Sequence, residues 1–283
     1  MVTMTIAPTI TIDRLNQLAC FPPDLSLEQA LADYVDAVTE ANARRPVAEE
    51  VTAIVPVFNT DPAMLHVALD SLLGQKLLPA QVIVIDDGSS RPETLAYLAA
   101  LRQSCLVQVL TNRDNLSLGP TMNRALRACP TPYALKLDAD DVARPALLAA
   151  YAAFLDKGEA IDVLGSQFTA FGHDSYTTTH PSRITRSYIL SSPGYWFVNH
   201  TGVLLNRDSV LKAGGYRALR GLAEDYDLWI RMMLKGFTHF ANLPESLVDY
   251  RDSATALHRN FRRGHNRLRL MALKAAIRLA PAF

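Results

Sequence analysis

The chain has 283 residues, of which 49% are hydrophobic and 20% charged, with 28 basic and 28 acidic side chains. This composition excludes a disordered or fibrous chain, and its neutral balance argues against nucleic acid as a partner. No apolar run approaches the ~20 residues that a membrane-spanning helix needs. The charge is uneven, because residues 251–283 carry eight basic side chains and one acidic side chain, which leaves the first 250 residues with a formal charge of −7.

The cysteines and the first residues bear on the cellular compartment. Cys20, Cys105 and Cys129 are odd in number and lack the spacing of a metal site, which favours reduced thiols over a disulfide framework. The first residues lack the basic and apolar regions of a signal peptide. We therefore expect a cytoplasmic protein.

Residues 1–48 are predicted to form an N-terminal helical extension. Ser26 and Gln29 have the spacing of a capping box, and apolar residues recur at helical intervals after them. Arg44-Arg45-Pro46 is expected to end this helix. We expect the extension to pack on the main domain or on a partner, such as a second copy of the chain.

Strands and helices are predicted to alternate between residues 51 and 137. The strands are continuous apolar runs, which predicts an α/β fold with a mostly parallel central sheet flanked by helices on both faces. Beyond residue 160 the pattern becomes mixed. The predicted strands are 51–57, 81–85, 106–111, 133–137, 163–168, 202–206 and 247–251, and the predicted helices are 92–103, 119–128, 207–213 and 225–234, with another between Asp61-Pro62 and Gly74.

Three carboxylates follow the strand at 133–137, in Asp138-Ala139-Asp140-Asp141. So much negative charge at the end of a buried strand is costly unless a cation offsets it. Aspartate oxygens suit Mg²⁺ or Mn²⁺, which such sites usually share with the phosphates of a substrate. The motif therefore predicts a metal site that holds a diphosphate, and a solvated turn with helix-capping aspartates is the alternative.

Other candidate residues also follow strand ends, where ligands bind in parallel sheets. Asp87, in Asp86-Asp87-Gly88, suits a base or a ribose, although Asp-Gly-Ser is equally an ordinary turn sequence. Phe58 suits stacking on a base, although an aromatic side chain there usually belongs to the core. Because the carboxyl ends of parallel strands meet at one edge, we expect these groups and the aspartate cluster to form one site.

Two further candidates lie in the second half of the chain. Glu224-Asp225 begins a predicted helix, where acids are favoured by the helix dipole without any catalytic role, but where a carboxylate also suits a general base. His200 precedes a short strand and is suited either to an acceptor or phosphate contact or to a structural role. No Walker A, G-x-G-x-x-G or G-x-S-x-G motif is present, which disfavours an ATPase, an NAD enzyme and a serine hydrolase.

Taken in order, these motifs resemble those of the family 2 glycosyltransferases, which are inverting enzymes with the GT-A fold. The resemblance covers residues 51–252. It implies a nucleotide-sugar donor, most often UDP-linked, and transfer with inversion at the anomeric carbon. The matching pieces are 54–59, 82–90, 115–126, 137–141, 214–216, 224–229 and 243–251.

The resemblance assigns roles on the donor side. Pro56 and Phe58 would border the base, and Asp87 would accept a hydrogen bond from it. Asp138 would lie near the ribose or the sugar. Asp140 would ligate the Mn²⁺ or Mg²⁺ ion that binds the diphosphate.

The resemblance also assigns roles on the acceptor side. Asp225 would be the base that deprotonates the acceptor hydroxyl, with Glu224 and Trp229 shaping this side of the site. Asn123 and His200 are the remaining expected substrate contacts. The chain departs from the family in two places: Met122 stands where many members have Arg, and a His that many members carry soon after Tyr250-Arg251 is replaced here by Asp252-Ser253, with His258 as a candidate substitute.

The resemblance implies a GT-A domain over residues 49–252. Its Rossmann-like nucleotide-sugar-binding half would span 49–145 and its mixed acceptor-binding half 146–252, followed by a basic amphipathic tail at 253–283. The implied activity is that of a metal-dependent hexosyltransferase acting on a saccharide or lipid-linked saccharide in polysaccharide biosynthesis. The alternatives are a non-catalytic relative that binds nucleotide-sugar or a partner, a haloacid-dehalogenase-like phosphatase and a sugar nucleotidyltransferase.

The tail raises a separate question. Leu270, Leu273 and Ile277 have helical spacing and are interleaved with basic residues. A basic amphipathic helix is suited to an anionic membrane surface, so we expect a peripheral contact with the inner face of the cell membrane. Packing of this helix on the main domain or on a second copy is the alternative.

Overall fold

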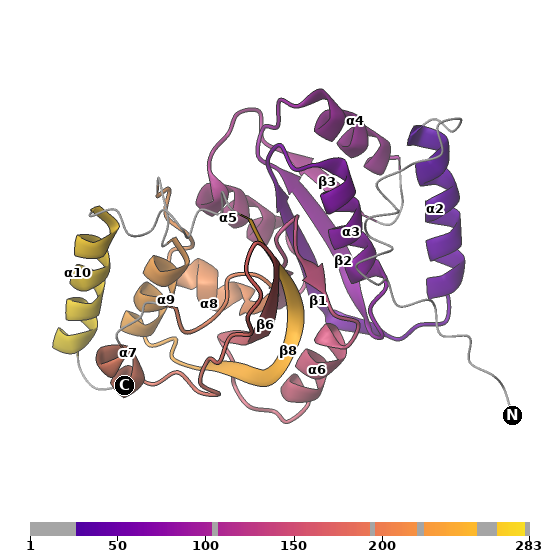
Figure 1. Ribbon diagram of the computed structural model, residues 1–283. Helices are drawn as coiled ribbons and strands as arrows, with labels where there is room; N and C mark the ends of the chain where they lie inside the picture. The colour runs from indigo at the N-terminus through magenta and orange to yellow at the C-terminus, as the bar shows by residue number, and fades with distance from the viewer. Residues whose placement is uncertain (1–26, 104–106, 193–195, 220–223, 254–264, 281–283) are drawn as a thin grey trace, which may run out of the picture.

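The computed structural model describes residues 27–103, 107–192, 196–219, 224–253 and 265–280. These residues form an eight-stranded sheet in the order β3-β2-β1-β4-β7-β6-β8-β5, with helices on both faces (Figure 1). The strands are β1 (Val47–Val57), β2 (Leu78–Asp86), β3 (Gln108–Thr111), β4 (Tyr133–Lys136), β5 (Val142–Ala143), β6 (Val163–Gly172), β7 (Val203–Asn206) and β8 (Phe240–Asp252). The helices are α2 (Leu27–Asn42), α3 (Pro62–Leu73), α4 (Pro92–Leu101), α5 (Leu118–Ala128), α6 (Leu147–Leu155), α7 (Arg186–Ser191), α8 (Arg207–Lys212), α9 (Glu224–Leu234) and α10 (His265–Leu279).

The pairing of the strands confirms the predicted α/β class. Strands β3, β2, β1 and β4 are parallel neighbours, and β6 is parallel to β8. The antiparallel pairs β4–β7, β7–β6 and β5–β8 make the sheet mixed in the second half of the chain. All eight strands belong to one sheet, so both halves of the chain share a continuous backbone ladder.

The sheet separates two hydrophobic cores. Alternate residues of a strand point to opposite faces, and in β1 Ala53 and Val55 join one core while Ile54 joins the other. Helices α3, α4 and α6 cover the first face, and α5, α8 and α9 cover the second. The central strands are buried on both faces, which explains why their sequences are continuously apolar.

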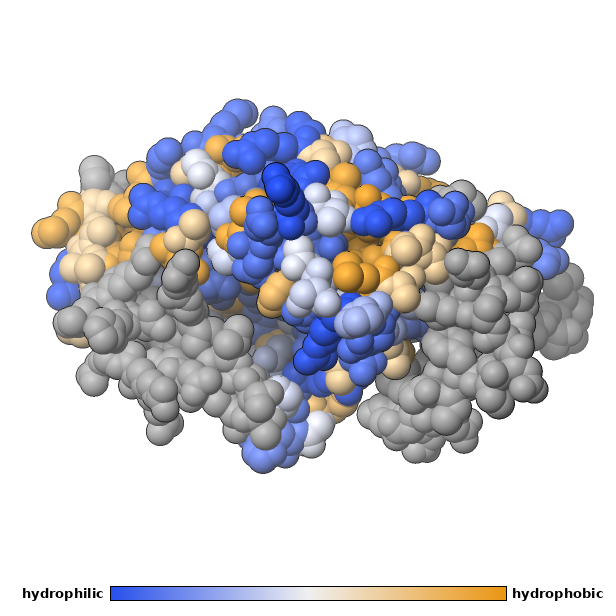
Figure 2. Space-filling view, turned by 90° about the horizontal axis from the view of Figure 1, so that it is seen from above, coloured by the Kyte–Doolittle hydropathy of each residue, from blue (hydrophilic) through white to orange (hydrophobic). Residues whose placement is uncertain are grey.

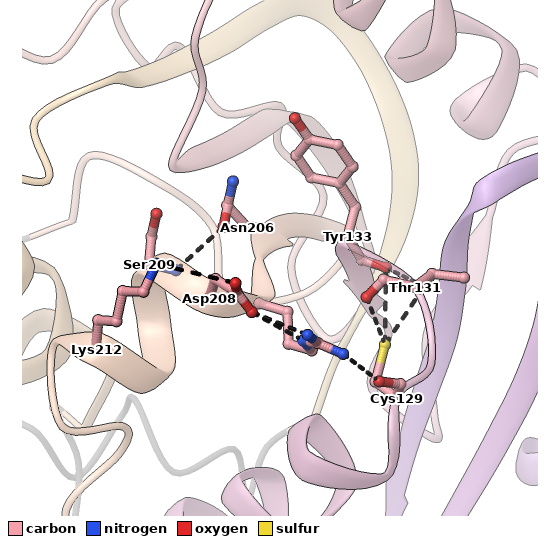
Figure 3. A network of polar contacts seen from close by, with 8 residues as sticks. Cys129, Thr131, Tyr133, Asn206, Asp208, Ser209 and Lys212 are labelled. Atoms are coloured by element: carbon pink, nitrogen blue, oxygen red, sulfur yellow. Dashed lines mark hydrogen bonds and ion pairs between the residues drawn. The ribbon is translucent and has the colours of Figure 1, made fainter.

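The sheet edge at the carboxyl end of β4 collects the predicted site residues. In the antiparallel β4–β7 pair, Lys136 is opposite Val203 and Tyr133 is opposite Asn206. The start of β7 therefore lies at the same edge as Asp138. The opposite edge is closed by the β7–α8 junction, where Asn206 accepts a hydrogen bond from the backbone N–H of Ser209 (3.1 Å), as Figure 3 shows.

The β7–α8 junction is also tied to the segment before β4. The Arg207 guanidinium donates to the backbone oxygen of Cys129 (2.8 Å) and pairs with Asp208 (2.9 Å), and Thr131 and Tyr133 complete the network (Figure 3). This arrangement is structural and lies away from the acid-rich edge.

The two terminal helices pack on opposite sides of the molecule (Figure 1). In α2, the Tyr34 hydroxyl donates to Asp70 of α3 (2.9 Å); the predicted capping box begins outside the described residues. In α10, Ile277 is buried and Leu273 packs beside it in the second core. Two of the three apolar residues that the sequence suggested for membrane contact, Leu273 and Ile277, therefore face the protein, where α10 packs against α7 and α9.

Exposed apolar side chains occur at several places on the described surface. Hydrophilic residues cover much of the face seen from above, between smaller hydrophobic patches (Figure 2). Across the described ranges, no helix combines the length and the apolar character needed to cross a bilayer. Phe58, Trp196, Met271 and Leu279 are among the exposed large hydrophobic residues.

Candidate functional site

Asp87 lies just beyond β2 and is held in one orientation. Its Oδ1 atom accepts hydrogen bonds from the Asn112 amide (2.8 Å), the backbone N–H of Leu116 (2.9 Å) and the Thr121 hydroxyl (2.6 Å). These three donors leave the Oδ2 atom for a further donor, such as the N–H of a base. Gly88 makes the turn possible, because it has a positive φ of 73° and a Cβ atom there would lie 2.7 Å from the backbone of Asp114.

Phe58 and Asn59 form the adjacent loop after β1. The Asn59 side chain accepts hydrogen bonds from the backbone N–H groups of Ser90 (2.7 Å) and Arg91 (2.9 Å), and the Asn59 N–H donates to Ser89 (2.8 Å). The Asp-Gly-Ser-Ser motif thus ties the two loops together. Phe58 is 50% exposed on this tied loop, so its ring is free of the core.

Pro56 lies in β1 opposite Ile85 of β2. The pairing of β1 with β4 ends two residues earlier, at Ile54 and Lys136, so Pro56 interrupts no bond of that ladder. It is half-buried at the base of the loop that carries Phe58. Pro56, Phe58 and Asp87 therefore lie at neighbouring strand ends, as the sequence predicts for parallel strands.

The aspartate cluster forms a turn after β4. The Asp141 N–H donates to the backbone oxygen of Asp138 (3.2 Å), and the Asp138 N–H donates to the Thr201 hydroxyl (3.2 Å) just before β7. Asp141 is buried and accepts from the backbone N–H of Arg251 (2.7 Å), whose guanidinium donates to the backbone oxygen of Asp140 (3.0 Å). The turn is thus fixed from β7 and β8.

The charges of this turn repel one another. Burial and then the negative charge of Asp138 raise the pKa of Asp140. Burial raises the pKa of Asp141 well above its usual value, and Asp138 and Asp140 raise it further. A divalent cation would relieve this repulsion, and carboxylate oxygens suit Mg²⁺ or Mn²⁺. Within the described ranges no three acidic, histidine or cysteine side chains converge on one point, so most ligands of such an ion would come from a diphosphate and water.

Glu224 and Asp225 begin α9 on the other side of the site. Burial raises the pKa of Asp225, while the backbone N–H of Tyr226 (2.8 Å) and the positive charge of Lys136 lower it. Burial and then the charge of Asp225 raise the pKa of Glu224. A buried carboxylate with a raised pKa is a stronger base than an exposed one, which suits proton abstraction.

A loop around Tyr216 holds α9 against α5. The Asn123 amide donates to the backbone oxygen of Tyr216 (2.7 Å) and accepts from its N–H (2.8 Å). Arg231 of α9 donates to the backbone oxygen of Gly215 (2.7 Å) and pairs with buried Asp227 (2.7 Å). Asn123, an expected substrate contact, therefore has both ends of its amide engaged by the backbone of this loop.

His200 and Trp229 lie beside this loop. His200 Nε2 and the Tyr216 hydroxyl are 2.9 Å apart. Burial, together with the charge of Lys136, lowers the pKa of His200 well below its usual value, so the imidazole is neutral at physiological pH. Trp229 is 1% exposed and packs its ring edge-on to His200, which places it beneath the site rather than on its surface.

Sequence reasoning did not single out Lys136 or Tyr216. Tyr216 is buried, and the charges of Asp225, Glu224 and Asp138 help to raise its pKa, after burial itself. A single lysine inside the apolar run 133–137 is unusual, and this feature of the sequence could have identified Lys136. His258 lies outside the described residues.

The sequence profile described as Glycosyl transferase family 2 matches residues 52–214. A UDP-Gal:alpha-D-GlcNAc-diphosphoundecaprenol beta-1,3-galactosyltransferase from Escherichia coli is 28% identical over 196 residues, which cover 68% of this chain and 70% of that protein. The amylovoran biosynthesis glycosyltransferase AmsE of Erwinia amylovora is 26% identical over 239 residues, which cover 80% of this chain and 86% of that protein.

Solved structures share the fold. S. aureus TarS 1–349 in complex with UDP-GlcNAc matches with a TM-score of 0.65 and 19% identity, over 83% of this chain and 68% of that one. The mannosyltransferase PcManGT from Pyrobaculum calidifontis, in complex with GDP-Man and Mn²⁺, matches with a TM-score of 0.59 and 18% identity, over 95% of this chain and 71% of that one. The fold is therefore that of GT-A transferases.

Proposed function

The chain belongs to glycosyl transferase family 2, and we propose that it transfers a sugar from a UDP-sugar to a hydroxyl of a saccharide or lipid-linked saccharide. The observation that carries this proposal is the presence of two acid groups, the turn at 138–141 after β4 and the pair at 224–225 at the start of α9, which lie close enough for the charges of Asp138 and buried Lys136 to act on both acids of the pair. The names of relatives support it: the E. coli relative is named for UDP-Gal and a diphosphoundecaprenol acceptor, and TarS was solved with UDP-GlcNAc.

On the donor side, Phe58 and Pro56 would border the base and Asp87 Oδ2 would accept its N–H. Asp138 would contact the sugar or the ribose. Asp140 would hold the divalent cation, which when bound neutralises charge on the leaving diphosphate.

On the acceptor side, Asp225 acts as the general base. It takes the proton of the acceptor hydroxyl while that oxygen bonds to the anomeric carbon and the bond from this carbon to the diphosphate breaks. Attack from the face opposite the diphosphate inverts the configuration. Glu224 and neutral His200 would orient the acceptor.

The test is a transfer assay with the full chain. Wild type is expected to release UDP from a UDP-sugar when Mn²⁺ or Mg²⁺ and a saccharide acceptor are present, and to bind UDP in calorimetry. Binding of GDP or dTDP in place of UDP would overturn the choice of uridine as the nucleoside of the donor, but not the proposed sugar transfer. UDP binding without turnover on any UDP-sugar and acceptor would favour the non-catalytic alternative.

Phe58→Ala is expected to weaken UDP binding about tenfold, because base–aromatic stacking contributes roughly 1–3 kcal/mol per base. Half of the side chain is exposed, so its removal leaves no cavity in the core. The dissociation constant from calorimetry measures the effect. Leu95→Ala, which removes a similarly exposed side chain from α4, is the control and should not change UDP binding. An unchanged dissociation constant for Phe58→Ala would remove Phe58 from the base site.

A peripheral membrane contact through α10 is part of the proposal. Leu273 and Ile277 pack inside, so exposed Met271 and Leu279, with the neighbouring positive charge of Arg278, would meet the lipid. Deletion of residues 262–283 is expected to reduce binding to anionic vesicles more than binding to neutral ones in a sedimentation assay. Equal binding before and after deletion would contradict this contact. Because α10 covers part of the second core, UDP binding must be checked to show that the truncated chain is folded.

A further inference from the structure

Lys136 is a buried lysine at the centre of the sheet. It is the last residue of β4, its side chain is 1% exposed, and the residues around it in the strand are apolar. Lysine is almost never fully buried unless it is paired with an opposite charge. Its partner is Asp138, whose Oδ1 atom lies 2.6 Å from the Lys136 ammonium. The ion pair therefore joins the floor of the site to the acid turn above it.

The ion pair leaves much of the ammonium unused. An ammonium group carries three donors, yet no described residue accepts a well-directed hydrogen bond from the Lys136 nitrogen. Asp138 in turn is 33% exposed and reaches the surface of the site. The buried Lys136 ammonium therefore holds the Asp138 carboxylate in place while part of that carboxylate stays exposed in the site.

The charge of Lys136 also reaches the acids at the start of α9. It lowers the pKa of Glu224 and of Asp225, in each case against the larger upward effect of burial. Two charges of this ion pair act on Asp225: Lys136 lowers the pKa of its carboxyl and Asp138 raises it.

We propose that Lys136 is a positioning residue for the transferred sugar, because its ion pair holds Asp138 toward the sugar of the donor. The inference rests on the proposed function and deepens it. The base of the nucleotide is bound elsewhere, around Phe58 and Asp87, and the diphosphate would be held through the ion at Asp140, so loss of Lys136 should impair recognition of the sugar and turnover far more than binding of UDP alone.

Lys136→Met removes the charge and keeps most of the side-chain volume. We expect kcat to fall about 10²-fold, the loss that small misplacement of a reacting group produces. The dissociation constant of UDP should stay within about twofold of wild type, which shows that the variant is folded. The acid limb of kcat/KM should move to higher pH, because the positive charge that favours ionised Asp225 is gone. A merely structural role would weaken UDP binding together with kcat and would not move the pH profile.

A double-mutant cycle with Asp138→Asn tests whether Lys136 works through Asp138. If it does, Lys136→Met/Asp138→Asn should be no slower than Asp138→Asn alone, within about twofold. Multiplied losses in the double variant would overturn the inference. So would a Lys136→Met variant with wild-type kcat, or one that loses UDP affinity in parallel with kcat.

A matched control separates this ion pair from ion pairs in general. Arg207→Met removes the cation of the Arg207–Asp208 pair at the opposite edge of the sheet, and we expect kcat and UDP affinity to stay at wild-type values. An inactive wild type would overturn the proposed function itself. An active wild type matched by an equally active Lys136→Met variant would overturn only the role of Lys136.

Discussion

Asp225→Asn is expected to lower kcat by about 10²- to 10⁴-fold, the range that a positioned general base contributes. Asparagine keeps the size of the side chain and its bond from the Tyr226 N–H, but it cannot take the proton of the acceptor hydroxyl. UDP binding should not change, because the residues proposed to bind the nucleotide base, Phe58 and Asp87, follow strands β1 and β2. Release of UDP measures kcat, and calorimetry measures UDP affinity.

Glu224→Gln is the matched control, because it changes the adjacent, half-buried carboxylate at the start of α9. We expect this variant to raise the KM for the acceptor and to lower kcat far less than Asp225→Asn does. The reverse order of effects would assign the base to Glu224. Near-normal turnover in both variants would show that neither carboxylate of α9 is the general base.

The pH profile of the wild type follows from the same carboxylate. The proposed mechanism needs ionised Asp225, and burial raises the pKa of this carboxyl above the usual aspartate value. Activity should therefore be lost as pH falls through this raised pKa, at a higher pH than for an exposed aspartate. In Asp225→Asn this limb of the kcat/KM profile should disappear.

Asp140→Asn is expected to abolish the metal dependence of UDP binding and to lower kcat by at least about 10²-fold. The carboxylate is the proposed protein ligand of a cation that otherwise contacts the diphosphate, and an amide oxygen without charge is a much weaker ligand. Calorimetric titration of UDP with Mn²⁺ and with a chelator measures the metal dependence directly. In wild type the affinity should be higher with Mn²⁺.

Asp156→Asn, at the exposed end of α6, is the control for loss of one negative charge and should behave as wild type. If UDP binding in Asp140→Asn still responds to Mn²⁺ as it does in wild type, Asp140 is not the ligand. Loss of the response in Asp138→Asn instead would assign the metal ligand to Asp138, two residues earlier in the turn.

Local sequence patterns predict most of the sheet but not all of the second half. The strands β1, β2 and β4 are recognisable because burial on both faces makes them continuously apolar. Helix α6 has no polar face, since its sequence is apolar throughout apart from one tyrosine, so it shows no helical periodicity. The first half of β8 contains Pro244 and Glu245 and pairs irregularly with β6, and only its apolar end was predicted as a strand.

The site is partly predictable for a related reason. Acids that follow an apolar strand stand out in a sequence, as Asp87 and Asp140 do. The partners of Asn123 and Lys136 do not, because they depend on contacts made by folding: the Asn123 amide meets the backbone of Tyr216, 93 residues further along the chain. The role of Asn123 in substrate binding stays a prediction, and the structure adds a second role for its amide in holding the Tyr216 loop.

The continuous β4–β7 ladder has a consequence for how such enzymes diversify. Because the first and second halves of the chain share one sheet, they cannot open and close as two rigid bodies about a hinge. A chimera that joined this first half to the second half of a relative would have to preserve the register of Lys136 with Val203, or the acids of the two halves would no longer face a common space. New acceptors are therefore more readily accommodated by changes in the connections at the sheet edge than by changes in the strands.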